Sequence, residues 1–236
     1  MVHLLQKALA VSLAMLALAP DSVWAEKGMS SKQSGKGKRG KKGRRTLTLE
    51  VTNLSVRQPF APFFVMSHDG TVPPLFTFGA NASVPLATLA ETGSPAELVD
   101  MYSAYLGSGA GEVKAFADGF PFMGGQSATF DVTVSDRYPY VTIASMAIHT
   151  NDCFVAVNGM RLNSGDTHFL PGLDAGSEAN DELCANIPGP ACMGGMGRST
   201  ENAEGFVHVH PGFHGVGDLA ENLYDWRNPM AVVKVM

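Results

Sequence analysis

Two carboxylates stand four residues apart in a short acidic turn, residues 173–182, between an apolar segment and a cysteine-bounded loop. Asp174 and Glu178 are separated by a bend containing Gly176, so their carboxylates can converge only where a positive charge offsets their repulsion. A hard divalent cation such as calcium, which takes oxygen ligands, supplies that charge. The turn therefore predicts a cation site, with an exposed acidic loop that binds nothing as the plain alternative.

A second group of residues could bind a softer metal. His208 and His210 lie on a predicted strand, where residues two apart share a face, and His214 follows shortly after. Met193 and Met196 lie upstream in a glycine-rich loop. Imidazole with thioether ligands suits copper, and paired strand histidines suit zinc. The competing prediction is a periplasmic copper- or zinc-binding protein. The alternative without a metal is that the histidines form hydrogen bonds across strands.

The three cysteines predict one structural bridge. Cys184 and Cys192 flank a turn-rich segment containing two prolines, so we expect them to form a disulfide. Cys153 begins an apolar run and is expected to be a small buried residue. If Cys192 is bridged, it cannot be a thiolate ligand.

The first 25 residues have the pattern of a secretory signal peptide. Lys7 precedes an apolar stretch, residues 8–19, and Ala25 closes a small-residue cleavage pattern. The apolar stretch is too short to span a bilayer, and no later run approaches the roughly 18 residues that a transmembrane helix needs. The sequence therefore predicts an exported protein, secreted or periplasmic, with no transmembrane segment.

Residues 26–45 are strongly basic, with nine Lys or Arg and a single acid. This stretch has almost no apolar residue, so we expect a disordered linker that either solubilises the protein or contacts anionic surface polymers, without specific nucleic-acid recognition. From Thr46 onward there are seven basic and twenty acidic residues. A body this acidic repels itself, and bound cations relieve that repulsion.

The rest of the chain, residues 46–236, has the pattern of one β-rich domain. Apolar and polar residues alternate in residues 46–52 and 128–134, and residues 140–148 and 154–162 form a predicted strand pair. Pro62 favours an edge or bent strand in residues 60–67. Two short helices in residues 84–106 are expected to cover a sheet edge or an end of the fold. We predict an all-β antiparallel sandwich with one to three short helices.

Catalytic motifs are lacking. The glycines at 107, 109 and 111 do not have the strand-then-helix context of a dinucleotide site, and neither a P-loop nor a nucleophile elbow is present. We therefore expect a protein without catalytic residues.

Four segments together resemble the spondin N-terminal domain of F-spondin and mindin, which also occurs as a stand-alone domain in exported bacterial proteins. They are residues 48–54 (TLEVTNL), 145–157 (SMAIHTNDCFVAV), 173–178 (LDAGSE) and 224–229 (YDWRNP). The family pattern in the third segment resembles Asp-Ala-Gly-Thr-Asp. Here Ser177 and Glu178 keep one hydroxyl and one carboxylate.

The resemblance implies a C2-like sandwich with one calcium ion bound by loops at one end. Carried over by position, the ligands would be Asp152, Asp174 and Glu178, with Asn151 and Asp181 in reserve. An aromatic residue commonly follows the first aspartate in animal members, whereas this chain has Cys153. The family activity is adhesion to proteins or surface polymers, and no catalysis is implied.

Overall fold

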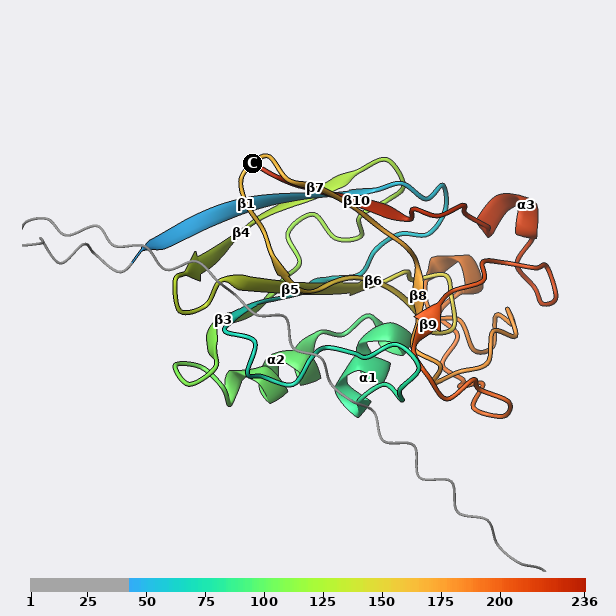
Figure 1. Cartoon of the computed structure of the whole chain (residues 1–236). Coiled ribbons are helices and arrows are strands. Elements are labelled where there is room, and N and C mark those ends of the chain that lie inside the picture. Colours follow the sequence, from blue (N-terminus) through green and yellow to red (C-terminus); the bar gives the residue numbers. More distant parts are fainter. Residues whose placement is uncertain (1–42) are drawn as a thin grey trace, which may run out of the picture. The chain divides into compact units, whose positions relative to one another are not determined.

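The computed structural model describes residues 43–236, which form two packed antiparallel sheets with short helices (Figure 1). The prediction of an antiparallel β-sandwich with one to three short α-helices is confirmed for this part of the chain. The predicted signal peptide, residues 1–25, and residues 26–42 of the predicted linker lie outside it. Within residues 43–236, no helix is long and apolar enough to cross a bilayer.

The smaller sheet has four strands in the order β4-β1-β10-β7. Their bounds are Ser127–Ser135 for β4, Arg44–Asn53 for β1, Ala231–Val235 for β10 and Thr167–Leu170 for β7. Strand β1 begins two residues before the expected start at Thr46, because Arg44 and Arg45 pair with the end of β4. The period-2 pattern then places Leu47, Leu49 and Val51 in the core and their neighbours outward.

The larger sheet has six strands in the order β3-β2-β5-β6-β8-β9. Their bounds are Ala110–Phe116, Phe63–His68, Tyr140–Met146, Cys153–Arg161, Leu173–Asp174 and His208–Val209, respectively. The predicted pairing of β5 with β6 is confirmed. Of the two alternatives for the segment that contains Pro62, the edge strand is wrong, because Pro62 precedes β2 and leaves its amides free to pair with both β3 and β5.

The facing surfaces of the two sheets enclose the main core. Phe63 lies at its centre, with ring centroids 5.6 Å from Phe122 and 5.5 Å from Phe130. Leu49 of β1 and Ile143 of β5 join the same buried cluster from opposite sheets. Burying one such side chain contributes about 2–3 kcal/mol, so alternation along the strands is enough to hold the sheets together.

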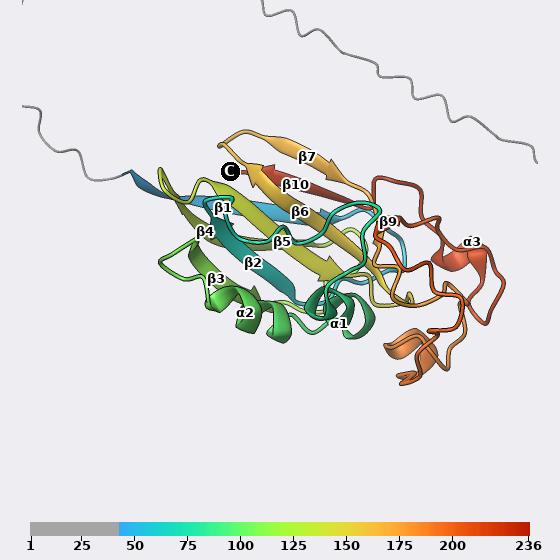
Figure 2. The same ribbon diagram turned by 60° about the horizontal axis from the view of Figure 1, so that its bottom comes forward.

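Helices α1 (Val84–Thr92) and α2 (Ala96–Ser103) cover the outer face of the six-stranded sheet (Figures 1 and 2). The expectation that they cover an edge or end of the fold is therefore wrong. Leu86 and Leu89 of α1 and Tyr102 of α2 share a second buried cluster with Phe64. Strand β2 is consequently buried on both faces, and all six of its residues are inaccessible. The Ser83 hydroxyl caps the start of α1, and Gly93, at φ 74°, ends it.

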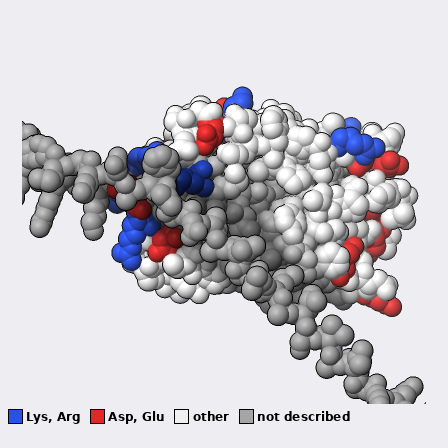
Figure 3. Space-filling view, in the orientation of Figure 1, with Lys and Arg blue, Asp and Glu red and all other residues white. Residues whose placement is uncertain are grey.

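Long connections gather beyond β8 and β9 at one end of the domain, together with the 3-10 helix Pro190–Cys192 and α3 (Glu221–Tyr224). The strand predicted to carry both His208 and His210 is reduced to His208–Val209. On the face seen in Figure 3, acidic side chains gather at this end of the domain. The residues expected to bind a metal lie in these connections or on the strands next to them.

Candidate metal centre

The aspartates of the two predicted loops meet through the pairing of β6 with β8. Asp152 directly precedes β6, and Asp174 ends β8 opposite Cys153. The amide of Ala175 donates a hydrogen bond to the carbonyl oxygen of Asp152 at 3.2 Å. Both aspartates are completely buried. Two carboxylates that are distant in the sequence are thus held side by side in a site shielded from water.

The acidic turn wraps around these two carboxylates. The amide of Gly176 donates to Asp174 Oδ1 at 2.7 Å, and the amides of Ser177 and Glu178 donate to Asp152 Oδ2 at 2.7 and 3.0 Å. Gly176 has a φ of 66°, and a Cβ there would lie 2.4 Å from the carbonyl oxygen of Phe206, so this position requires glycine. Asp152 Oδ1 has no hydrogen-bond partner, although it is buried.

His208 joins the site from the neighbouring strand. It pairs with Asp174 across β8 and β9, and its Nε2 lies 3.8 Å from Asp174 Oδ2. Its Nδ1 lies 3.1 Å from the carbonyl oxygen of Phe206 and therefore donates a proton to it. The lone pair of the neutral ring is then on Nε2, which is the orientation that metal-binding histidines adopt.

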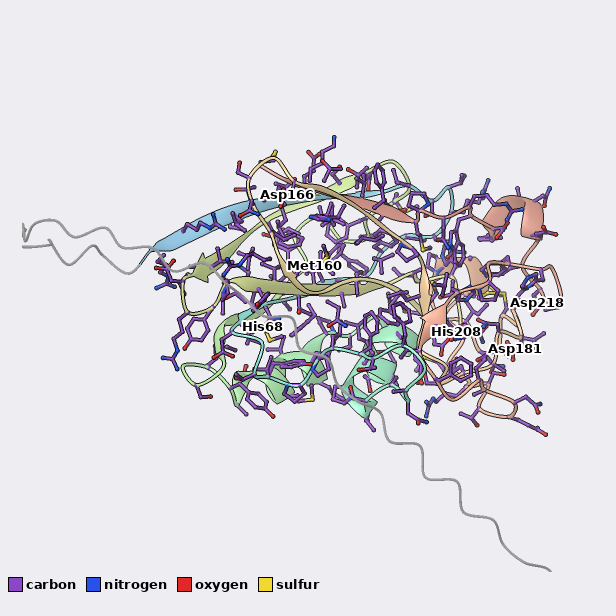
Figure 4. The ribbon with its side chains drawn as sticks, in the orientation of Figure 1. His68, Met160, Asp166, Asp181, His208 and Asp218 are labelled. Carbon is purple, nitrogen blue, oxygen red and sulfur yellow. A yellow bond between two sulfur atoms is a disulfide. The ribbon has the colours of Figure 1, made fainter. Side chains whose placement is uncertain are left out.

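Glu204 completes a group of three. Within residues 43–236, ligand atoms of Asp174, Glu204 and His208 all lie within 4.8 Å of one another. The amide of Asn180 bridges the two acids, donating to Asp174 Oδ2 at 2.7 Å and to Glu204 Oε1 at 3.3 Å. Two carboxylates and an imidazole at this spacing can hold a metal ion. Figure 4 labels His208 at the loop end of the fold, away from His68.

His210 lies beside this group with the opposite ring orientation. Its Nε2 is 3.9 Å from Asp174 Oδ2, but its Nδ1 accepts a hydrogen bond from the amide of Gly212 at 3.0 Å. A neutral imidazole has one lone pair, so Nε2 carries the proton and cannot coordinate a metal. Burial lowers the pKa of His210 to about 3 and keeps the ring neutral.

The electrostatics of the site favour a cation. Burial, followed by repulsion from Asp174, raises the pKa of Asp152 to about 8. Burial also raises the pKa of Asp174, and it raises that of Glu178 to about 7, with Glu91 adding to the effect. These carboxyl groups ionise only at an energetic cost, and a bound cation would offset that cost.

The other predicted calcium ligands have different neighbours. Glu178 is buried, but its Oε1 lies 3.5 Å from Arg198 Nε. Asn151 donates from Nδ2 to Asp181 Oδ1 at 3.0 Å, and Asp181 also accepts hydrogen bonds from the amide of Leu183 and the side chain of Asn186. Asp181 is thus saturated with donors and anchors the loop. Of the predicted set Asp152, Asp174 and Glu178, the three-residue group contains only Asp174.

The predicted copper ligands do not assemble. Met193 and Met196 are 95% and 92% exposed, and His214 is exposed, so nothing fixes these three side chains around a metal. Cys184 and Cys192 form the predicted disulfide, with sulfur atoms 2.11 Å apart, so Cys192 is not a thiolate ligand. Cys153 is free and buried, as expected. The two sites were predicted separately, but one residue from each lies in the same group of three. The predicted calcium site contributes Asp174, and the predicted copper or zinc site contributes His208.

Sequence reasoning missed Glu204. It lies in a turn-rich stretch without a strand or helix pattern, and only the pairing of β8 with β9 brings it to Asp174. The acidic character of the body was the only signal for it.

No protein-family model matches the chain, and a search of curated proteins found no match. A function for this chain therefore has to be inferred from the residues of the site.

Proposed function

We propose that this chain is an exported, non-catalytic binding module whose loop end is clamped by a divalent cation. The observation that carries the proposal is the group formed by Asp174, Glu204 and His208, backed by Asp152 with its unpartnered Oδ1. The group joins β8, β9 and the turn before β9. A cation bound there would tie these segments together and neutralise buried negative charge.

Calcium is the first candidate for this cation. The site offers oxygens from Asp174 and Glu204, and Asp152, which precedes the strand paired with Asp174, has a buried oxygen without a hydrogen-bond partner. Backbone carbonyls and water would have to supply the remainder of the six to eight oxygens that calcium takes. The resemblance to spondin N-terminal domains supports the same ion. At an affinity of roughly 10⁻⁴ M and about 1 mM free calcium, binding would stabilise the domain by about 1.4 kcal/mol.

Zinc is the second candidate, and the orientation of His208 favours it. A free Nε2 lone pair beside two carboxylates is a mixed nitrogen and oxygen ligand set, which zinc accepts and calcium does not use. In this arrangement, the hydrogen bond from His208 Nδ1 to the carbonyl oxygen of Phe206 would hold the ring with Nε2 toward the metal.

The binding role is proposed from three supports. The disulfide is compatible with an oxidising compartment. The basic residues 26–45 can contact anionic surface polymers, and the resemblance adds adhesion to proteins or polymers. The module would present its clamped loops to such a partner.

Thermal melts of the metal-stripped protein test the proposal. We expect calcium or zinc to raise the melting temperature, and an Asp174→Asn variant to lose the increase. His208→Ala separates the ions, because it should abolish a zinc effect and leave a calcium effect largely intact. His214→Ala is the matched control, since His214 is outside the group. Identical midpoints with chelator, calcium and zinc, together with no metal by elemental analysis, would refute the proposal.

A further inference from the structure

A separate cavity of about 350 Å³ lies beside the end of α1. Its walls include Glu91, Glu178, Pro188, Met196 and Arg198. Cavities of this size accommodate a single side chain or a small ligand. The lining combines two carboxylates with an apolar rim.

Both carboxylates of this cavity are withdrawn from solvent. The side chain of Glu178 is 1% exposed and that of Glu91 is 9% exposed. Glu178 Oε1 is buried without a hydrogen-bond partner. Two buried acids facing one cavity favour a cationic group between them, because an unpaired buried charge is strongly unfavourable.

Arg198 currently supplies that cationic group. Its Nη2 lies 2.5 Å from Glu91 Oε1, while its Nε lies 3.5 Å from Glu178 Oε1, too far for a hydrogen bond. The Arg198 side chain is 56% exposed. One wall of the cavity is therefore a guanidinium group that satisfies one acid well and the other poorly.

The backbone on either side of Arg198 is anchored. The amide of Gly197 donates to the carbonyl oxygen of Ala185 at 2.8 Å, and the carbonyl oxygen of Ser199 accepts from the amide of Ala179 at 2.6 Å. A Cβ at Gly197 would lie 2.3 Å from Asn186 Oδ1, so the segment packs tightly on the disulfide loop. The Arg198 side chain can thus turn away from the two acids without movement of the loop.

We propose that this cavity is a recognition site for an arginine side chain of a protein partner, and that Arg198, which forms one wall, pairs with the two acids until the partner's arginine displaces it. The two acids match the fork of a guanidinium group, which pairs with carboxylates in a planar geometry that lysine cannot reproduce. Pro188 and Met196 at the rim would contact the aliphatic part of the incoming side chain. Because the Arg198 side chain is 56% exposed and its contact with Glu178 is long, exchange of one guanidinium for another is feasible.

Removing Arg198 tests the proposal. The probe is Nα-acetyl-arginine amide, titrated by calorimetry and NMR into the full chain and into Arg198→Ala, in chelator so that the metal centre has no influence. We expect Arg198→Ala to bind the probe at least tenfold more tightly than the unmodified chain. The neutral isostere Nα-acetyl-citrulline amide should not bind, and Glu178→Gln combined with Arg198→Ala should lose the gain.

Equal affinity of the probe for the chain and for Arg198→Ala would overturn the proposal, as would equal binding of the citrulline analogue. If Arg198→Ala does not fold, Arg198→Gln, which keeps most of the side-chain length without the charge, replaces it. Agmatine tests whether a free amine-bearing guanidine is the ligand instead: binding of agmatine in preference to an arginine-containing peptide would contradict a protein partner. The outcome does not depend on whether the Asp174 centre binds metal.

Discussion

Replacing Asp152 with asparagine is predicted to stabilise the metal-free domain and to weaken its response to a cation. Asparagine can keep one oxygen in the place of Oδ2, which accepts three hydrogen bonds from Ser177 and Glu178. Its amide group would occupy the position of Oδ1, which has no partner. The substitution removes a buried charge while preserving the anchor of the turn.

The magnitude of this effect depends on the pKa of Asp152, which burial raises from 3.8 to about 8. The native state therefore holds the proton more tightly than the unfolded state, so the contribution of Asp152 to stability is most favourable below about pH 4 and falls as the pH rises to about 8. Each pH unit in this window costs about 1.4 kcal/mol, or about 4 kcal/mol in total at pH 7. Asparagine does not titrate, so we expect Asp152→Asn to gain about 2–4 kcal/mol at pH 7 and nothing at pH 4.

Urea unfolding in chelator at pH 4, 7 and 8 measures this effect, and a melting temperature raised by about 5–15 °C at pH 7 would accompany it. Asp118→Asn is the control, because Asp118 is exposed and outside the site. With calcium or zinc present, the unmodified chain should recover stability and the variant should recover less. If Asp152→Asn is less stable than the unmodified chain in chelator at pH 8, then the charge on Asp152 is already compensated and the reasoning fails.

Two further predictions concern the loops around the site. His149 donates from Nδ1 to the carbonyl oxygen of Arg57 at 2.7 Å and accepts at Nε2 from the amide of Ala191, and burial lowers its pKa. Its contribution to stability should be complete above pH 6.5 and lost as the pH falls below it, so the stability difference between the chain and His149→Gln should shrink between pH 7 and 5. Replacing both Cys184 and Cys192 with serine opens a short loop and should cost about 2–3 kcal/mol in urea unfolding; an unchanged midpoint would show that the hydrogen bonds of this loop hold it without the bridge.

Much of the fold could be predicted because its strands have a local signature. The alternation in β1 and β4 has the same period as their burial. The position of α1 and α2 could not be predicted, because an apolar stripe shows that a helix is buried but not against which surface. The same limit applies to β2, whose burial on both faces depends on those helices.

The chemistry of the site divides in the same way. Residue type and spacing alone identified Asp174, His208 and the Cys184–Cys192 bridge, since carboxylates, imidazoles and closely spaced cysteines have properties that do not depend on the fold. Tertiary structure alone decided that Asp174 and His208 belong to one centre, that Glu204 joins them and that Glu178 faces Arg198. The physical reason is that these contacts join segments far apart in the chain, such as Asp174 and His208, through two-residue strands and irregular turns. Such pairings have no period that a sequence could display.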